Sequence, residues 1–111
     1  MSKTIDFENL RLITDGDQEL EKELFLAFLG SSAECISNLV AAYDMDDEED
    51  WKHQAHALKG ICLNLGAILL GELSKKAQED YRATKQEKEK MLNAIQSELT
   101  QVRQIITPLL N

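Results

Sequence analysis

The fold is decided by one stretch of the chain, HALKGICLNLG at residues 56–66. Placed on a helix at about 100° per residue, the stretch separates into two faces. The apolar residues of this stretch and of the preceding turn lie more than about 110° from His56; they are Trp51, Leu58, Ile61, Cys62 and Leu65. Within about 60° of His56 lie Lys52, His53, Lys59, Gly60 and Leu63. We therefore expect a helix that buries its apolar face and exposes the histidine between two lysines.

Two neighbours of His56 indicate chemistry rather than structure. A glycine inside a helix destabilises it by roughly 1 kcal/mol relative to alanine, so Gly60 calls for a reason, and space for another molecule beside the imidazole is one. A neutral imidazole is a competent nucleophile near pH 7, because its unperturbed pKa is about 6.5. Lys59 stands one turn after His56 and can offset negative charge that develops there. His56 is thus a candidate nucleophile.

Outward from this stretch, the apolar residues recur with helical spacing almost throughout. Gly66 is a typical helix stop, so the histidine helix is expected over about 48–64. Further helices are expected over 18–43, 67–83 and 87–107, and a shorter one over 4–13 with Thr4 as its cap. The pattern predicts an all-α protein, an antiparallel up-down four-helix bundle with a short additional N-terminal helix.

The short turn at Gly66 predicts an antiparallel hairpin, and this brings Gln78 level with His56. His56 is ten residues before Gly66 and Gln78 is twelve after it. At 1.5 Å per residue, the two lie about 15 and 18 Å from the turn. Gln78 can therefore reach the imidazole across the hairpin, although an ordinary solvated glutamine is an alternative.

The length and composition limit the functions that fit. A chain of 111 residues can form a single domain over residues 1–111 with one modest core. Its net charge of −8 argues against binding to nucleic acid or an acidic membrane. The acidic run at 44–50 is interpreted as a solvated connection whose last acids stabilise the next helix. With no signal region and no transmembrane run, we expect a cytoplasmic protein. We also expect a monomer, because one four-helix core uses all the apolar faces.

The residues quoted above resemble a known family. His56-x-x-Lys59-Gly60, followed by Gly66-Ala67, is similar to the signature of histidine-containing phosphotransfer (HPt) domains, and the similarity extends over nearly the whole chain. These domains are four-helix bundles that carry a phosphoryl group on a histidine in two-component phosphorelays. The resemblance implies that His56 is the phosphoacceptor, that Lys59 stabilises the phosphoryl charge and that Gly60 gives access. It also implies that Gln78 orients the imidazole.

The resemblance implies a carrier rather than an enzyme. His56 would accept a phosphoryl group from the aspartate of a receiver domain or from a hybrid sensor kinase, and pass it to the aspartate of a response regulator. Lys52, His53 and Leu63 are expected to dock the partner. The chain has no phosphate loop or Walker-type lysine, so we expect no cofactor, with Mg²⁺ supplied by the receiver. Since the chain starts with methionine and shows no fused segment, we expect a free-standing carrier.

The family's usual pattern has small residues where this chain has Ile61, Cys62 and Leu63. Ile61 and Cys62 are expected to face inward, so the departure that bears on partner choice is Leu63. Two alternatives stay open. One is a helical binding protein that inhibits or scaffolds a kinase or receiver domain without being phosphorylated. The other, more remote, is a metal site that includes His53 and His56.

Overall fold

The computed structural model describes residues 4–110, and all regular structure within that range is helical. The helices, in chain order, are α1 (Glu8–Thr14), α2 (Gln18–Asp44), α3 (Glu48–Leu65), α4 (Ile68–Glu79), α5 (Lys85–Ile106) and a final 3₁₀ turn, η1 (Thr107–Leu110). The expected all-α class is confirmed.

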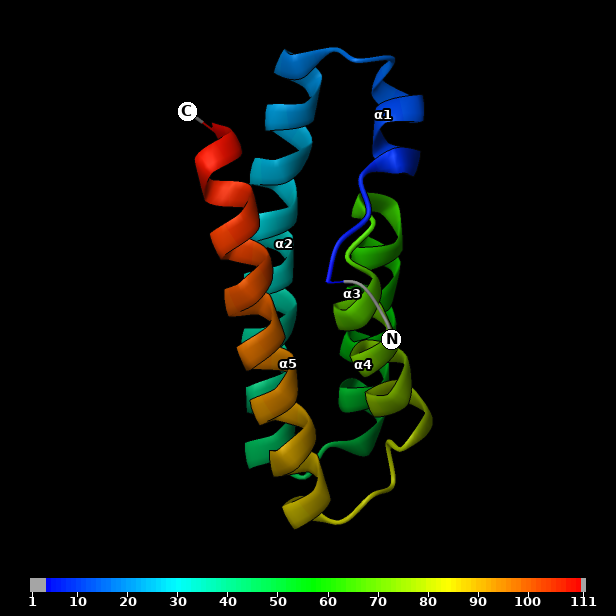
Figure 1. Ribbon diagram of the computed structural model, residues 1–111. Helices are drawn as coiled ribbons and strands as arrows, with labels where there is room; N and C mark the ends of the chain where they lie inside the picture. Colours follow the sequence, from blue (N-terminus) through cyan, green and yellow to red (C-terminus); the bar gives the residue numbers. More distant parts are fainter. Residues whose placement is uncertain (1–3, 111) are drawn as a thin grey trace.

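The four longer helices pack in a closed ring, in which α2 contacts α3 and α5, and α4 contacts α3 and α5. Figure 1 shows α2 and α5 side by side along the long axis and running in opposite directions. The molecule measures 43 × 27 × 21 Å. Because α4 has only 12 residues, it accompanies α3 over part of its length. The short α1 packs against α2 and α3 at the upper end in Figure 1.

Side-chain caps explain where α2 and α3 begin. Asp17 accepts a hydrogen bond from the Leu20 amide and Asp47 accepts one from the Asp50 amide, at the starts of α2 and α3. The first turn of α3 contains Glu48, Glu49 and Asp50, which its dipole favours. The acidic run is thus a short connection followed by a capped helix start, as the sequence indicates.

The prediction that the first helix begins near Thr4 is wrong, because α1 starts only at Glu8. Residues 4–7, here called the N-terminal strap, precede it and lie outside any helix. Within the strap, the Asp6 amide donates to the Gly66 carbonyl at 2.8 Å. The Asp6 carboxylate accepts from the Glu8 amide at 3.0 Å. The strap is therefore tied to the turn between α3 and α4.

The turn between α3 and α4 depends on Gly66. Its φ of 95° lies in the left-handed region, and its amide closes the helix by donating to the Cys62 carbonyl at 2.9 Å. A Cβ at this position would also collide with the Asp6 carbonyl oxygen. Glycine is required here for two independent reasons, and its place just after α3 agrees with the sequence expectation.

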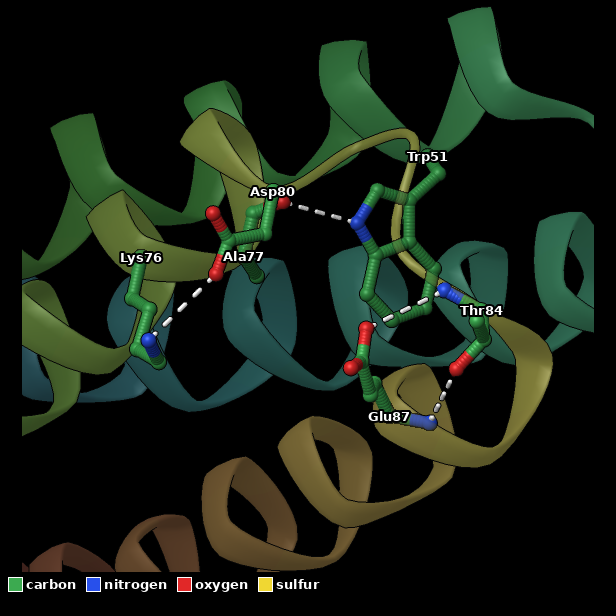
Figure 2. A network of polar contacts seen from close by, with 6 residues as sticks. All are labelled: Trp51, Lys76, Ala77, Asp80, Thr84 and Glu87. Carbon is green, nitrogen blue, oxygen red and sulfur yellow. Dashed lines mark hydrogen bonds and ion pairs between the residues drawn. The ribbon is translucent and has the colours of Figure 1, made fainter.

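Helix α4 ends at Glu79, so the prediction that it continues to residue 83 is wrong. Figure 2 shows how the end is fixed: the Trp51 indole Nε1–H donates to the Ala77 carbonyl at 2.8 Å, and Lys76 pairs with Asp80 at 3.3 Å. Trp51 thus satisfies one of the carbonyls that a helix end leaves without an internal partner. The chain then turns toward α5.

Helix α5 begins at Lys85, two residues earlier than predicted, because Thr84 and Glu87 form a capping box. The Glu87 amide donates to the Thr84 hydroxyl, and the Thr84 amide donates to the Glu87 carboxylate, each at 3.2 Å. The Thr84-x-x-Glu87 pattern is visible in the sequence, so this start could have been predicted.

The core lies between the four longer helices. Its fully buried side chains include Leu39, Trp51, Leu58, Leu70 and Ile95. Helix α2 is long and apolar enough to cross a membrane by length and composition, and an 18-residue window of it has a mean hydropathy of 1.5. Core helices of soluble proteins pass the same test, and α2 packs here against α3 and α5.

Candidate functional site

His56 lies on the solvent-facing side of α3. Its side chain is exposed, whereas Trp51, Leu58 and Cys62 on the opposite side are fully buried. The two faces that the sequence predicts are therefore present. The burial of the apolar face fixes the rotation of α3 about its axis, and this rotation holds the imidazole outside the core.

Gln78 on α4 contacts the imidazole of His56 across the hairpin, with 3.3 Å between Gln78 Oε1 and His56 Nδ1. A carbonyl oxygen only accepts hydrogen bonds, so Nδ1 carries the hydrogen in this arrangement. The other ring nitrogen, Nε2, is then left with its lone pair. The contact that the spacing from Gly66 predicts is thus present, and in this tautomer it leaves the Nε2 lone pair unused.

Lys59 and Gly60 lie on the next turn of α3, beyond His56. The Lys59 side chain is half-buried and Gly60 is exposed. A Cβ built at Gly60 meets no atom within 4 Å. No contact within the described residues therefore requires glycine at this position.

The residues expected to dock a partner are all exposed, but their surroundings differ. Leu63 has 63% of its surface exposed, high for a large apolar side chain. Lys52 places its Nζ 4.7 Å from the centre of the Tyr81 ring, and Arg82 stacks on the same ring at 5.2 Å. The charge of Lys52 is therefore directed at an aromatic face. Within the described residues, His53 has no side-chain hydrogen bond.

A hollow of about 400 Å³ lies between α3 and α4, next to Lys59. Its apolar part is formed by Cys62, Leu63 and Ile68, and its charged groups are Lys59, Glu72 and Lys75. Lys75 was missed in the sequence reasoning. The hairpin register contains the signal, because Lys59 is seven residues before Gly66 and Lys75 is nine after it.

The thiols of the two cysteines are not reactive groups of this site, although Cys62 lines the hollow. Burial raises the pKa of Cys62 to about 12, with a smaller contribution from nearby Cys35, while a hydrogen bond with Ser74 acts in the opposite direction. Burial, together with Glu34, also raises the pKa of Cys35. Both thiols are therefore protonated at neutral pH and behave as small apolar groups. Within residues 4–110, no group of three or more His, Cys, Asp or Glu side chains could hold a metal ion.

Comparisons with known proteins agree with this geometry. Residues 23–105 match the family model of the Hpt domain. The structure is similar to the crystal structure of histidine-containing phosphotransfer protein B (HptB) from Pseudomonas aeruginosa PAO1. The TM-score is 0.88 at 25% sequence identity, over 97% of this chain and 95% of that one. No match to the chain was found among curated proteins.

Proposed function

The chain belongs to the Hpt domain family, and from this premise we propose that His56 is the residue that carries the phosphoryl group. Members of this family transfer phosphoryl groups within phosphorelays and are carriers rather than enzymes. In the proposal, His56 accepts the group from a receiver-domain aspartate or a hybrid sensor kinase. It then passes the group to the aspartate of a response regulator.

One observation supports the proposal most directly: the exposed His56 ring is held through Nδ1 by Gln78 Oε1 at 3.3 Å. The ring is therefore accessible to another protein and is held in one orientation at the same time. Here one nitrogen is engaged, and this fixes the tautomer and the ring orientation. The other nitrogen is the one available to a partner.

The transfer step uses no group of this chain as an acid or base. The Nε2 lone pair attacks the phosphorus of the partner's phosphoaspartate and forms the N–P bond, while the P–O bond breaks. Its electron pair stays on the carboxylate oxygen that leaves, so atoms and charge balance. The Nδ1 hydrogen remains on the ring, where its hydrogen bond to Gln78 stabilises the positive charge that the imidazole gains. Return transfer is the reverse of this step.

The surrounding residues have distinct roles in the proposal. Lys59 offsets the negative charge of the phosphoryl oxygens, and Gly60 leaves the space that the incoming active site occupies. Lys52, His53 and Leu63 form the docking surface. The Mg²⁺ that supports the transfer belongs to the receiver domain, so this chain needs no cofactor of its own.

The carrier is proposed to be a cytoplasmic monomer, with residues 1–111 as a single domain. In this proposal α2–α5 form an antiparallel up-down bundle. Three facts support it: these helices contact one another in a closed ring, their apolar faces are buried against each other, and the net charge is −8. This charge disfavours binding to nucleic acids or acidic lipids.

The test is to incubate the chain with several radiolabelled phosphorylated receiver domains and to follow the label. We expect acid-labile label on the wild type, none on His56→Gln, and retained but slower labelling of His53→Gln, which changes the docking surface and not the phosphoacceptor. If H56Q is labelled like the wild type, the assignment of His56 is wrong. If no receiver labels the wild type while H56Q still binds receivers with wild-type affinity, the chain is a binding protein that is not phosphorylated.

A further inference from the structure

The hollow next to Lys59, on the turn of α3 that follows His56, differs in charge from the chain as a whole. The chain has a net charge of −8, yet the hollow next to Lys59 contains two lysines, Lys59 and Lys75, and one glutamate, Glu72. The charged groups of the hollow thus sum to +1. A phosphoryl group brings two or so negative charges to this place, so the local excess of positive charge is relevant to it.

The hairpin register places Lys75 opposite Lys59. His56 on α3 contacts Gln78 on α4, so these two residues define one level of the hairpin. Three residues nearer to Gly66 on each helix, about 4.5 Å along the axis, stand Lys59 and Lys75. Both line the same hollow. Helix α3 therefore contributes His56 and, one turn nearer to Gly66, Lys59. Helix α4 contributes Gln78 at the level of His56 and Lys75 at the level of Lys59.

The ammonium group of Lys75, unlike those of Lys76 and Lys52, is not engaged by another side chain within the described residues. Within the described residues it forms no ion pair and no ring contact, whereas its neighbour Lys76 pairs with Asp80 at 3.3 Å. Lys52, the other cation near His56 on α3, lies over the Tyr81 ring at 4.7 Å. Lysine carries its ammonium on a flexible four-carbon stem, and the exposed Lys75 can swing toward the level of His56.

We propose that Lys75 is a second charge-stabilising residue of the transfer site, which contacts the phosphoryl oxygens from the α4 side while Lys59 contacts them from α3. This inference rests on the proposed function of His56 and adds a residue to it. It adds no step to the reaction, because both ammonium groups keep their protons and only neutralise charge. The two lysines would act on opposite sides of the same phosphoryl group.

The first experiment uses phosphoramidate, a small phosphoryl donor, so that no partner protein is involved. The rate of His56 phosphorylation is followed by mass spectrometry for the wild type and for Lys75→Gln, Lys75→Arg, Lys59→Gln and Lys76→Gln. We expect a reduction of about two- to fivefold for K75Q, as for loss of one exposed ion pair. K75R should stay within twofold of the wild type and K59Q should lose at least as much as K75Q. K76Q, the matched control on the same helix, should not change.

The second experiment replaces phosphoramidate with a phosphorylated receiver domain. We expect K75Q to slow this transfer as well, with a difference from the wild type that shrinks as salt is added. The inference is overturned if K75Q reacts with phosphoramidate at the wild-type rate. If, in addition, only the reaction with the receiver slows, Lys75 is a docking residue and does not contact the phosphoryl group. If neither donor labels His56 in the wild type, the proposed function itself fails.

Discussion

At the residue level, His53 and His56 differ in the residues around them, and above all in the contact of His56 with Gln78. Both side chains are exposed on α3, one turn apart. Only His56 meets an amide oxygen, that of Gln78, and only it is followed by a lysine and a glycine at the third and fourth positions. The identity of the side chain is therefore not what singles out His56 as the proposed carrier residue. The distinction arises from what the neighbouring helix places beside the ring.

Gly60 gives a prediction in which stability and function change in opposite directions. Because a Cβ at Gly60 meets nothing within 4 Å, Gly60→Ala should stabilise the chain by about 0.5–1 kcal/mol through helix propensity. Urea unfolding measures this gain. Transfer from a phosphorylated receiver should slow, because the methyl group enters the space reserved for the partner. Equal transfer by G60A and wild type would show that access at this position is not limiting.

Because the Cys62 thiol is buried, we expect the protein to lose stability at high pH. Burial raises its pKa to about 12, from 9.0 for the free thiol, so only the unfolded chain ionises this group between those values. The stabilisation is complete below pH 9 and is lost as the pH rises toward 12. At pH 10.5 the wild type should lose about 2 kcal/mol that Cys62→Ala does not lose.

Urea unfolding of both proteins at pH 8 and at pH 10.5 measures this difference. Lysines and tyrosines also titrate in this range, but they are shared by the two proteins and cancel in the comparison. Parallel losses in the wild type and C62A would mean that the Cys62 thiol is not shielded from solvent.

At the level of elements, the turn between α3 and α4 sets the register on which the site depends. Gly66 ends α3, and its carbonyl accepts a hydrogen bond from the Asp6 amide of the N-terminal strap. One residue thus joins α3 and α4 to the strap, which lies far from both in the sequence. The level match of His56 with Gln78, and that of Lys59 with Lys75, both follow from where this turn occurs.

Two glycines with similar backbone conformations allow the contribution of the strap to be measured. Gly66 has φ 95° and Gly16 has φ 79°, but only at Gly66 would a Cβ strike the Asp6 backbone. We expect Gly16→Ala to destabilise by about 1–2 kcal/mol, the usual penalty of the left-handed region. Gly66→Ala should destabilise by about 2–4 kcal/mol.

The strap should also detach in G66A. The Asp6 amide, which donates to the Gly66 carbonyl, is expected to exchange its hydrogen faster in G66A than in G16A. Equal free energies of unfolding, with unchanged exchange at Asp6, would contradict the role assigned to this contact.

The elements that the sequence predicts well are those with a strong local signal. Asp17 and Gly66 mark the start of α2 and the end of α3 because capping and left-handed φ are properties of single residues. The end of α4 could not be predicted in this way. It depends on Trp51, 26 residues earlier in the chain, whose indole donates to the Ala77 carbonyl. Such a contact exists only once the helices have packed.

The same distinction applies to the candidate site. The exposure of His56 and its contact with Gln78 follow from helical periodicity and one turn, so both could be predicted. The position of Lys52 over Tyr81 could not, because Tyr81 was assigned to a longer α4. The register argument that predicts the position of Gln78 also places Lys75 opposite Lys59, because each of these lysines lies three residues nearer to Gly66.

For the molecule as a whole, the two ends are closed by different interactions. The start of α5 lies at the lower end in Figure 1. In its first turn, Lys85 lies over the ring of Tyr43 and Lys88 over that of Trp51, at 4.7 and 5.2 Å. At the upper end, α1 packs against α2 and α3, with Leu10 in the core. We infer that the upper end, which depends on a helix of seven residues, opens more easily.

This difference can be tested with two leucines of α1. Leu10 has 2% of its surface exposed and Leu12 has 76%. Leu10→Ala should destabilise by about 2–5 kcal/mol because it leaves a cavity, whereas Leu12→Ala should change stability by less than about 0.5 kcal/mol. In L10A, hydrogen exchange should accelerate in α1 and the first half of α2, while the fluorescence of Trp51 keeps its native value. A uniform acceleration that includes the surroundings of Trp51 would show that the two ends open together.

The amide oxygen of Gln78 also has a consequence for the product. An imidazole can be modified at either of its two nitrogens, which gives two positional isomers with different shapes and reactivities. Since Nδ1 is turned toward α4 and engaged there, the carrier proposed here would form a single isomer. A receiver would then always meet the group at the same distance from the helix axis and in the same direction. The regiochemistry of the signal would be fixed by a residue that never touches phosphorus.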